Sequence, residues 1–129
     1  YLYAASHQNT SDIRLKKDVT PIMNALSILY DINGYQYTWK KDEFPDLATP
    51  EGVDIGVIAQ EVEVHFPDLV TTGKGGFKNL QIGKLVAVLI EAIKELRAEK
   101  NYEMDELRIE NQELKAYLCS NDANAPFCE

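Results

Sequence analysis

Residues 84–118 read KLVAVLIEAIKELRAEKNYEMDELRIENQELKAYL and contain neither proline nor glycine. Alanine, leucine, glutamate and lysine dominate this stretch, and all four residue types are strong helix formers. At 1.5 Å per residue the predicted helix is roughly 50 Å long, which exceeds what the core of a small domain can cover. We therefore expect a long C-terminal helix that the chain's own core covers only in part.

The apolar residues of this helix follow one seam, with the steps of three and four residues that are typical of a coiled coil. A four-residue stutter interrupts the heptads between Leu96 and Met104, and Asn111 occupies a seam position where one polar residue can fix the register. The alternative is a helix buried in its own domain, but glutamates on the remaining faces favour an oligomer. The predicted seam consists of Leu85, Leu89, Ile93, Leu96, Met104, Leu107, Asn111, Leu114 and Leu118.

The residues before this helix mix helix and strand signals, which predicts an α+β head followed by the long C-terminal helix. Thr20 can cap a helix whose first position is Pro21, and Asn33-Gly34 can end it. A loop with prolines and acidic residues spans 40–54. The expected elements are a helix at 20–29, strands at 35–39 and 55–58, a helix at 59–66, and a hairpin of 69–72 with 77–82.

Composition excludes several classes of function. The 129 residues carry a net charge of −8, and such an acidic chain repels phosphate backbones, so nucleic acid is not expected as a partner. No apolar run approaches the ~20 residues of a membrane span, so no membrane is expected either. The glycine-rich loop at 73–76 lacks the Lys-Ser/Thr ending of a phosphate-binding loop and is interpreted as a turn. The opening residues lack the features of a signal peptide, and we expect a fragment of a longer protein.

The two cysteines, Cys119 and Cys128, lie near the C-terminus. Two thiols without nearby histidines make a poor zinc site, so neither a metal nor another cofactor is expected. A local disulfide is sterically possible, and the sequence leaves its formation open. In a reducing cytoplasm we expect the thiols to stay unpaired.

The stretch from residue 10 to residue 19 reads TSDIRLKKDV. A serine acts as a nucleophile when a base takes its proton, and a lysine can be that base if it is shielded from water or lies beside another cation. Ser11 and Lys16 provide these two groups. Their spacing alone is weak evidence, because a serine and a lysine in a solvated loop are common.

Four segments together carry a family resemblance: SDIRLKKDV with Pro21, GYQYTWK, IGVIAQEVEVHFPDLV and KLVAVLIEAIKEL. Their order and spacing resemble the intramolecular chaperone and auto-processing domain that ends phage endosialidases, tail spikes, L-shaped tail fibres and neck appendages. A relative of that domain occurs in myelin regulatory factor. The resemblance covers residues 11 to about 97.

The resemblance implies a homotrimer that assists the folding of its own N-terminal fibre or β-helix domain. It implies that this takes place in the host cytoplasm, after which self-cleavage releases the domain and the parent protein remains in the virion tail. By position, Ser11 and Lys16 match the family's Ser-Lys dyad, and the cut bond joins Ser11 to Asp12. Where relatives often have Val-Asp-Tyr before the long helix, this chain has Leu80-Gln81-Ile82. No tyrosine hydroxyl is therefore expected to act there.

The supporting residues and the attacking atom stay open. Arg14, Gln60 and Glu61 are candidate supporting residues, and the last two can orient the site, pair with Arg14 or Lys16, or simply face water on an amphipathic helix. Attack by Ser11 on its own carbonyl carbon would close a strained four-membered ring. Two routes remain: Ser11 cuts the equivalent bond of another chain, or the Asp12 carboxylate attacks through a six-membered ring.

Two other functions compete with a self-cleaving chaperone. One is a non-catalytic trimerisation or attachment tip that stays on the fibre, and the other is the processing domain of a membrane-bound transcription factor. The second is less favoured because no membrane segment follows the coil. The expected division of the chain is 1–11 for the fibre end and lead-in, 12–83 for the chaperone head, 84–118 for the coiled-coil helix and 119–129 for the tail.

Overall fold

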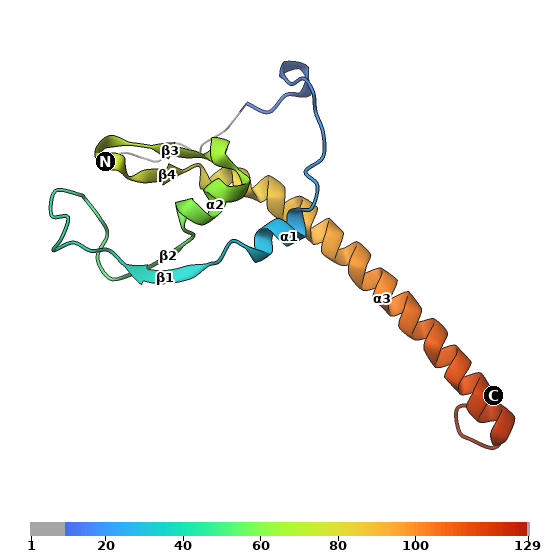
Figure 1. Ribbon diagram of the computed structural model, residues 1–129. Helices are drawn as coiled ribbons and strands as arrows, with labels where there is room; N and C mark the ends of the chain where they lie inside the picture. Colours follow the sequence, from blue (N-terminus) through green and yellow to red (C-terminus); the bar gives the residue numbers. More distant parts are fainter. Residues whose placement is uncertain (1–9, 129) are drawn as a thin grey trace.

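The structure is a computed structural model that describes residues 10–128. A head of short helices and strands surrounds the start of one long helix, which projects far beyond the head (Figure 1). The predicted α+β head with a long C-terminal helix is therefore confirmed. The helices and strands are α1 (Ala25–Tyr30), β1 (Tyr35–Thr38), β2 (Val53–Gly56), α2 (Ala59–His65), β3 (Val70–Thr72), β4 (Lys78–Leu80) and α3 (Leu85–Asn121).

The strands form two separate antiparallel pairs. In the first, β1 pairs with β2 so that Tyr35 lies opposite Gly56. In the second, β3 pairs with β4, with Val70 opposite Leu80. The predicted hairpin is confirmed, although its strands are shorter than expected. Its turn contains Gly75 and Gly76, both with φ of 80°, a left-handed conformation that glycine adopts without a steric penalty.

The core of the head is small and lies where three helices meet. Its buried side chains come from α1, from α2 and from the first turns of α3. The five buried residues are Ala25, Val62, Leu85, Val88 and Ala92. Leu85 was predicted as a seam residue, yet only 8% of its surface is exposed because α1 and the head already cover it.

The predicted start of the first helix is wrong. Instead of beginning at Thr20 and Pro21, α1 begins at Ala25, after Asn24 in a left-handed conformation with φ of 56°. Asn24 makes no side-chain cap, and the cap comes from α3: the two carboxylate oxygens of Glu95 accept hydrogen bonds from the backbone N–H groups of Ala25 (3.1 Å) and Leu26 (2.7 Å). A distant carboxylate therefore satisfies the free N–H groups that open a helix.

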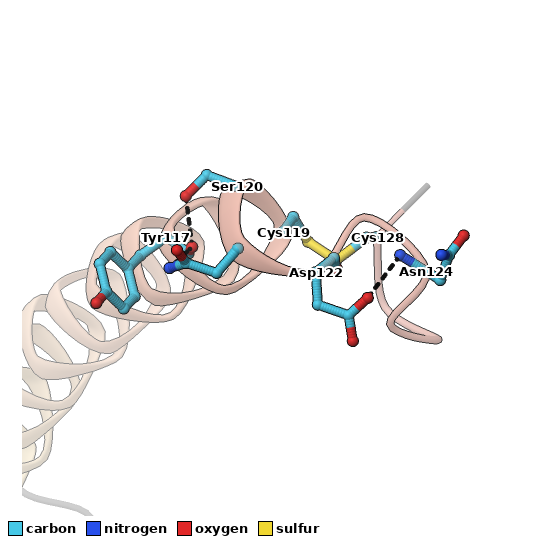
Figure 2. The surroundings of a disulfide bond; sticks show 7 residues. Tyr117, Cys119, Ser120, Asp122, Asn124 and Cys128 are labelled. Atoms are coloured by element: carbon cyan, nitrogen blue, oxygen red, sulfur yellow. Dashed lines mark hydrogen bonds between the residues drawn. A yellow bond between two sulfur atoms is a disulfide. The ribbon is translucent and has the colours of Figure 1, made fainter.

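Helix α3 runs for 37 residues, three residues beyond the predicted end at Leu118. Past Asn121 the chain curls back, and a disulfide bond joins Cys119 to Cys128 (Figure 2). The backbone N–H of Asn124 donates to Asp122 in this tail, at 3.1 Å. The structure thus pairs the two thiols, whose state the sequence left open. Among the helices of residues 10–128, none has the length and apolar character needed to cross a membrane.

Candidate functional site

The proposed nucleophile and base lie in direct contact. Lys16 Nζ donates a hydrogen bond to Ser11 Oγ at 2.7 Å. Between them, Ile13–Leu15 form one 3-10 turn, in which Leu15 N–H bonds to the Asp12 carbonyl and Lys16 N–H to the Ile13 carbonyl, both at 3.1 Å. This single turn brings the serine and lysine side chains together across five residues of sequence.

Asp12 starts that turn and is held by Arg14. Its Oδ1 accepts from the Arg14 backbone N–H at 2.8 Å, and Arg14 Nη2 donates to Oδ2 at 2.8 Å. The Arg14 side chain, and then its backbone N–H, lower the pKa of Asp12, while the Asp12 carboxylate raises the pKa of Arg14. Arg14 therefore favours the ionised form of Asp12 and engages both of its oxygens, directly beside the Ser11–Asp12 bond.

A largely apolar groove of about 1150 Å³ opens beside the dyad. Its other walls come from the end of α2, from β4 and from the start of α3. The lining residues are Thr10, Ser11, Lys16, Ile22, Phe66, Leu69, Leu80, Gln81, Ile82, Gly83, Lys84, Ala87 and Val88. Both dyad residues are exposed in the single chain. The groove can accept an extended segment or a neighbouring surface next to the serine.

Gln60 and Glu61 do not join this site in the single chain. Glu61 Oε1 accepts from Tyr35 Oη at 2.7 Å, and Glu61 Oε2 accepts from the backbone N–H of Asn33 at 3.0 Å. The Tyr35 hydroxyl is the main cause that lowers the pKa of Glu61, and the same bond raises the pKa of Tyr35. Glu61 thus ties α2 to β1, whereas Gln60 is exposed at a separate hollow beside Trp39.

His65 has a partner that the sequence did not indicate. Its Nε2 lies 2.8 Å from Asp31 Oδ2, and the imidazole is 23% exposed. The two residues are 34 positions apart, so no local pattern could have paired them. This contact joins the end of α1 to the end of α2 on the side of the head and adds no group to the dyad.

The seam of α3 divides into two parts. Leu85 is buried by its own chain, whereas the other apolar seam residues are exposed along the projecting helix. Their exposed fractions are Leu89 46%, Ile93 65%, Leu96 49%, Met104 44%, Leu107 53%, Leu114 55% and Leu118 40%. Asn111 is exposed between them. Large apolar side chains exposed along one face of a helix are typical of a protein contact.

A family model described as chaperone of endosialidase, with the name Peptidase_S74, matches residues 11–71. The chain is 35% identical over 80 residues to the long tail fiber protein Gp37 of Salmonella phage S16, which covers 62% of this chain and 11% of that protein. It is 38% identical over 72 residues to Gp37 of Escherichia phage AR1, covering 56% of this chain and 6% of that protein. The chain thus spans about a tenth or less of the length of these curated relatives.

Residues 11–71 thus match the chaperone-of-endosialidase family, as the motifs in the sequence predicted. The matched segment begins at Ser11 and includes the 3-10 turn between Ser11 and Lys16, α1, both strands of the first pair, α2 and the first two residues of β3. The whole of α3 and β4 lie outside the segment that the family model covers.

Proposed function

We propose that this chain is the chaperone and self-processing segment at the end of a phage tail fibre. Three copies assemble through α3, assist the folding of the fibre domain that precedes them, and cut the chain between Ser11 and Asp12. The family match and the two tail-fibre relatives support the chaperone role. The observation that carries the peptidase role is the contact of 2.7 Å between Lys16 Nζ and Ser11 Oγ.

The proposal divides the chain by task. Residues 1–11 end the fibre, 12–83 form the chaperone head, 84–118 form the trimeric coiled coil, and 119–129 form a tail closed by its disulfide. Assembly takes place in the bacterial host cytoplasm. The parent protein then becomes part of the virion tail, and the segment from Asp12 onward is released.

Activation of the dyad requires more than the contact itself. A lysine takes a proton from serine only as a neutral amine, and removal of water around the amine favours that form. Lys16 is exposed in the single chain. The groove beside it can be covered by a neighbouring copy, which would exclude water from the amine. Cleavage therefore follows trimerisation in this proposal.

Two routes for the attack are still compatible with the geometry. In the first, Ser11 of one chain attacks the carbonyl of the equivalent bond in another chain, the Asp12 amine leaves with a proton from Lys16, and water then hydrolyses the ester on Ser11. In the second, the Asp12 carboxylate attacks the Ser11 carbonyl, the Asp12 amine leaves with a proton that Ser11 and Lys16 deliver, and water hydrolyses the resulting mixed anhydride. Because Arg14 engages both Asp12 oxygens, the second route requires that at least one of these bonds opens first.

The test of the dyad is a chain that carries additional upstream fibre sequence, followed by mass spectrometry of the products. Ser11→Ala and Lys16→Ala should each leave only uncut chain. Thr10→Ala and Lys17→Ala are matched controls, since they remove a neighbouring hydroxyl and a neighbouring amine, and both should cut like the parent. Full cleavage in either dyad variant would exclude this mechanism.

Mixed trimers decide between the two routes. Cleavable chains and Ser11→Ala chains of different length are refolded together, and the products are identified by mass. If Ser11 acts between chains, the Ser11→Ala chain is cut when it shares a trimer with intact chains. If the attack stays within one chain, only the intact chain is cut.

A second candidate function is an attachment tip that trimerises and remains on the fibre without cutting. The exposed position of Lys16 favours it, because a lysine serves as a general base when it is shielded from water. Whether the wild-type chain is cut distinguishes the two functions. A wild-type trimer with upstream sequence that stays intact over days supports the tip and contradicts the peptidase.

A cleavage site suits a folding aid for physical reasons. Fibre and β-helix trimers must bring three chains into register before long-range strand pairing becomes favourable, and this step is slow and prone to aggregation. A coiled coil at the C-terminus raises the local concentration of the three chains. Removal of the coil afterwards eliminates the path by which the folded fibre could open from that end, which increases kinetic stability.

A further inference from the structure

The half of α3 beyond the stutter carries a regular heptad pattern. Met104, Asn111 and Leu118 occupy the first core position, a, and Leu107 and Leu114 occupy the second, d. Helix α3 is continuous through this region, and the four apolar members are between 40% and 55% exposed. This half of the helix meets no part of the head (Figure 1). Its core face is therefore available to a partner along its whole length.

The two flanks of this face carry opposite charges. On one flank, at position g, lie Glu103 and Glu110; on the other, at position e, lie Arg108 and Lys115. All four side chains are exposed. Within one helix, a g residue and the following e residue are five positions apart, which separates them by roughly 140° around the axis. These acids and bases therefore cannot pair with each other inside one chain.

The contacts that these side chains make within residues 10–128 are weak. Arg108 lies 3.7 Å from Asp105, and both side chains are 71% exposed. Such a pair, three residues apart on a solvated helix, contributes little to stability. The charged flanks thus remain able to choose a partner on another helix.

We infer that these flanks align neighbouring copies of the chain parallel and in register, with Glu103 facing Arg108 and Glu110 facing Lys115 of the next copy. The inference rests on the proposed trimer and specifies how its chains are oriented. In a parallel coiled coil the g residue of one helix lies beside the e residue of the following heptad on its neighbour. Here each such contact joins an acid to a base.

The opposite orientation is disfavoured by the same residues. In an antiparallel coil, g flanks face g flanks and e flanks face e flanks. The glutamates would then face glutamates, and the basic side chains would face each other. Like charges held together in this way destabilise the assembly. The charge pattern therefore selects against antiparallel pairing as well as for parallel pairing.

Asn111 selects the register. With no shift, the Asn111 amides of all copies lie in one layer and can hydrogen-bond to one another. A shift by one heptad would place each amide in an apolar layer beside Met104 or Leu118, where its polar atoms lose their partners. The same shift would leave one acidic and one basic residue without a partner at the ends. In-register parallel chains keep every one of these contacts.

This alignment has a consequence for the head. Parallel helices place all heads at one end of the stalk, which is the part of α3 that projects beyond the head. An in-register arrangement sets the Ser11–Asp12 bonds of all copies at the same level along the helix axis. The preceding fibre segments then leave the assembly side by side, as three chains of one fibre must.

The test is a double-mutant cycle on the full chain, with the trimer dissociation constant measured by analytical ultracentrifugation at low salt. Glu103→Lys and Arg108→Glu each replace an attractive contact by a repulsive one in every interface of the trimer. Each single variant should therefore raise the dissociation constant roughly tenfold to a hundredfold. The combined variant restores opposite charges and should return to within about threefold of the parent.

A matched control is Glu106→Lys, which makes the same charge change on the outer face of the same helix turn. It should alter the dissociation constant by less than about threefold. High salt should shrink the effect of both single variants, because exposed ion pairs are screened.

The outcomes separate the two proposals. Suppose that the parent chain trimerises, but the combined variant loses as much association free energy as the two single variants together. Glu103 and Arg108 then do not face each other, and this inference fails while the proposed trimer stands. If the parent chain stays monomeric at every concentration, the proposed trimer fails and the alignment fails with it.

Discussion

The two halves of α3 use their apolar residues in opposite ways. In the first half, Leu85, Val88 and Ala92 are at most 8% exposed, because α1 and the rest of the head cover them. In the second half, Leu107 and Leu114 are more than half exposed, on a stretch of α3 against which no helix or strand of residues 10–128 packs (Figure 1). The apolar residues of α3 are thus buried in the core of the head at one end of the helix and left exposed at the other. The head therefore completes its core within one chain, whereas the second half of α3 leaves apolar residues exposed, as the proposed trimer requires.

The polar residues follow the same division. In the first half, both carboxylate oxygens of Glu95 accept hydrogen bonds from the backbone of α1 in the same chain. Glu103 and Glu110, in the second half, stand exposed beside the apolar face. The carboxylate of Glu95 thus holds α1 against α3 within one chain. Those of Glu103 and Glu110 remain for the inferred contacts with neighbouring copies.

The largest effect is expected from charges within the exposed core of the stalk. Leu107→Glu combined with Leu114→Glu would place glutamates in the two core layers on either side of Asn111 in the proposed trimer, where burial of unpaired charge is prohibitive. We expect the chain to become monomeric and cleavage to stop, while the head retains its fold. Sedimentation, mass spectrometry and the chemical shifts of head residues measure these three quantities.

The matched control replaces two exposed apolar residues on the outer face of the same segment. Tyr102→Glu combined with Ile109→Glu changes residues that are 66% and 55% exposed but lie away from the seam. This variant should trimerise and cut like the parent. Efficient cleavage by a monomeric Leu107/Leu114 variant would contradict the dependence of cutting on assembly.

A smaller effect, limited to the head, is expected from Glu95→Ala. The change leaves the N–H groups of Ala25 and Leu26 without their acceptor in a partly buried position. Loss of such a cap should lower the free energy of unfolding of the head by about 2 kcal/mol, as read from chemical denaturation. Glu99→Ala, at an exposed position of the same helix, should change it by less than about 0.5 kcal/mol. Equal losses in both variants would mean that the cap contributes nothing.

The smallest effect is a change in pH dependence from Tyr35→Phe. The Tyr35 hydroxyl holds the pKa of Glu61 below its ordinary 4.5. A lowered folded-state pKa contributes stability above the unfolded pKa, and this contribution disappears as the pH falls through the folded value. Tyr35→Phe should therefore be slightly less stable than the parent at pH 7, and the difference should vanish well below pH 4.5.

Thermal unfolding at several pH values measures that difference. Tyr37→Phe, which removes a hydroxyl from the same strand without touching Glu61, is the control and should show no such trend. A gap between parent and Tyr35→Phe that stays constant down to pH 3 would show that the hydroxyl stabilises the fold without regard to the charge on Glu61.

Elements with strong local patterns could be predicted from the sequence. The absence of proline and glycine over 84–118, the glycine-rich turn at 73–76 and the Pro67 that follows α2 each act within a few residues of their effect. The start of α1 could not be predicted in this way. Thr20 and Pro21 are a normal helix opening, but the carboxylate that caps the helix is about 70 residues away on α3.

The candidate site divides along the same line. The pairing of Ser11 with Lys16 was expected from the family resemblance, and the 3-10 turn at Ile13–Leu15 supplies the physical reason for it. The partners of Glu61 could not be expected, because Asn33 and Tyr35 approach it only once β1 lies against α2. Sequence reasoning had offered Arg14 or Lys16 instead, and Arg14 binds Asp12.

What the sequence determined by itself is the α+β head, the length of the stalk and the stripe of apolar residues along it, since helix propensity and periodicity are properties of neighbouring residues. The tertiary structure alone decided where that stripe divides. Leu85 is buried in the head because it packs with Ala25 of α1, and Glu95 accepts hydrogen bonds from the first N–H groups of the same helix. Contacts between residues some 70 positions apart depend on how the chain closes on itself, which no local pattern records.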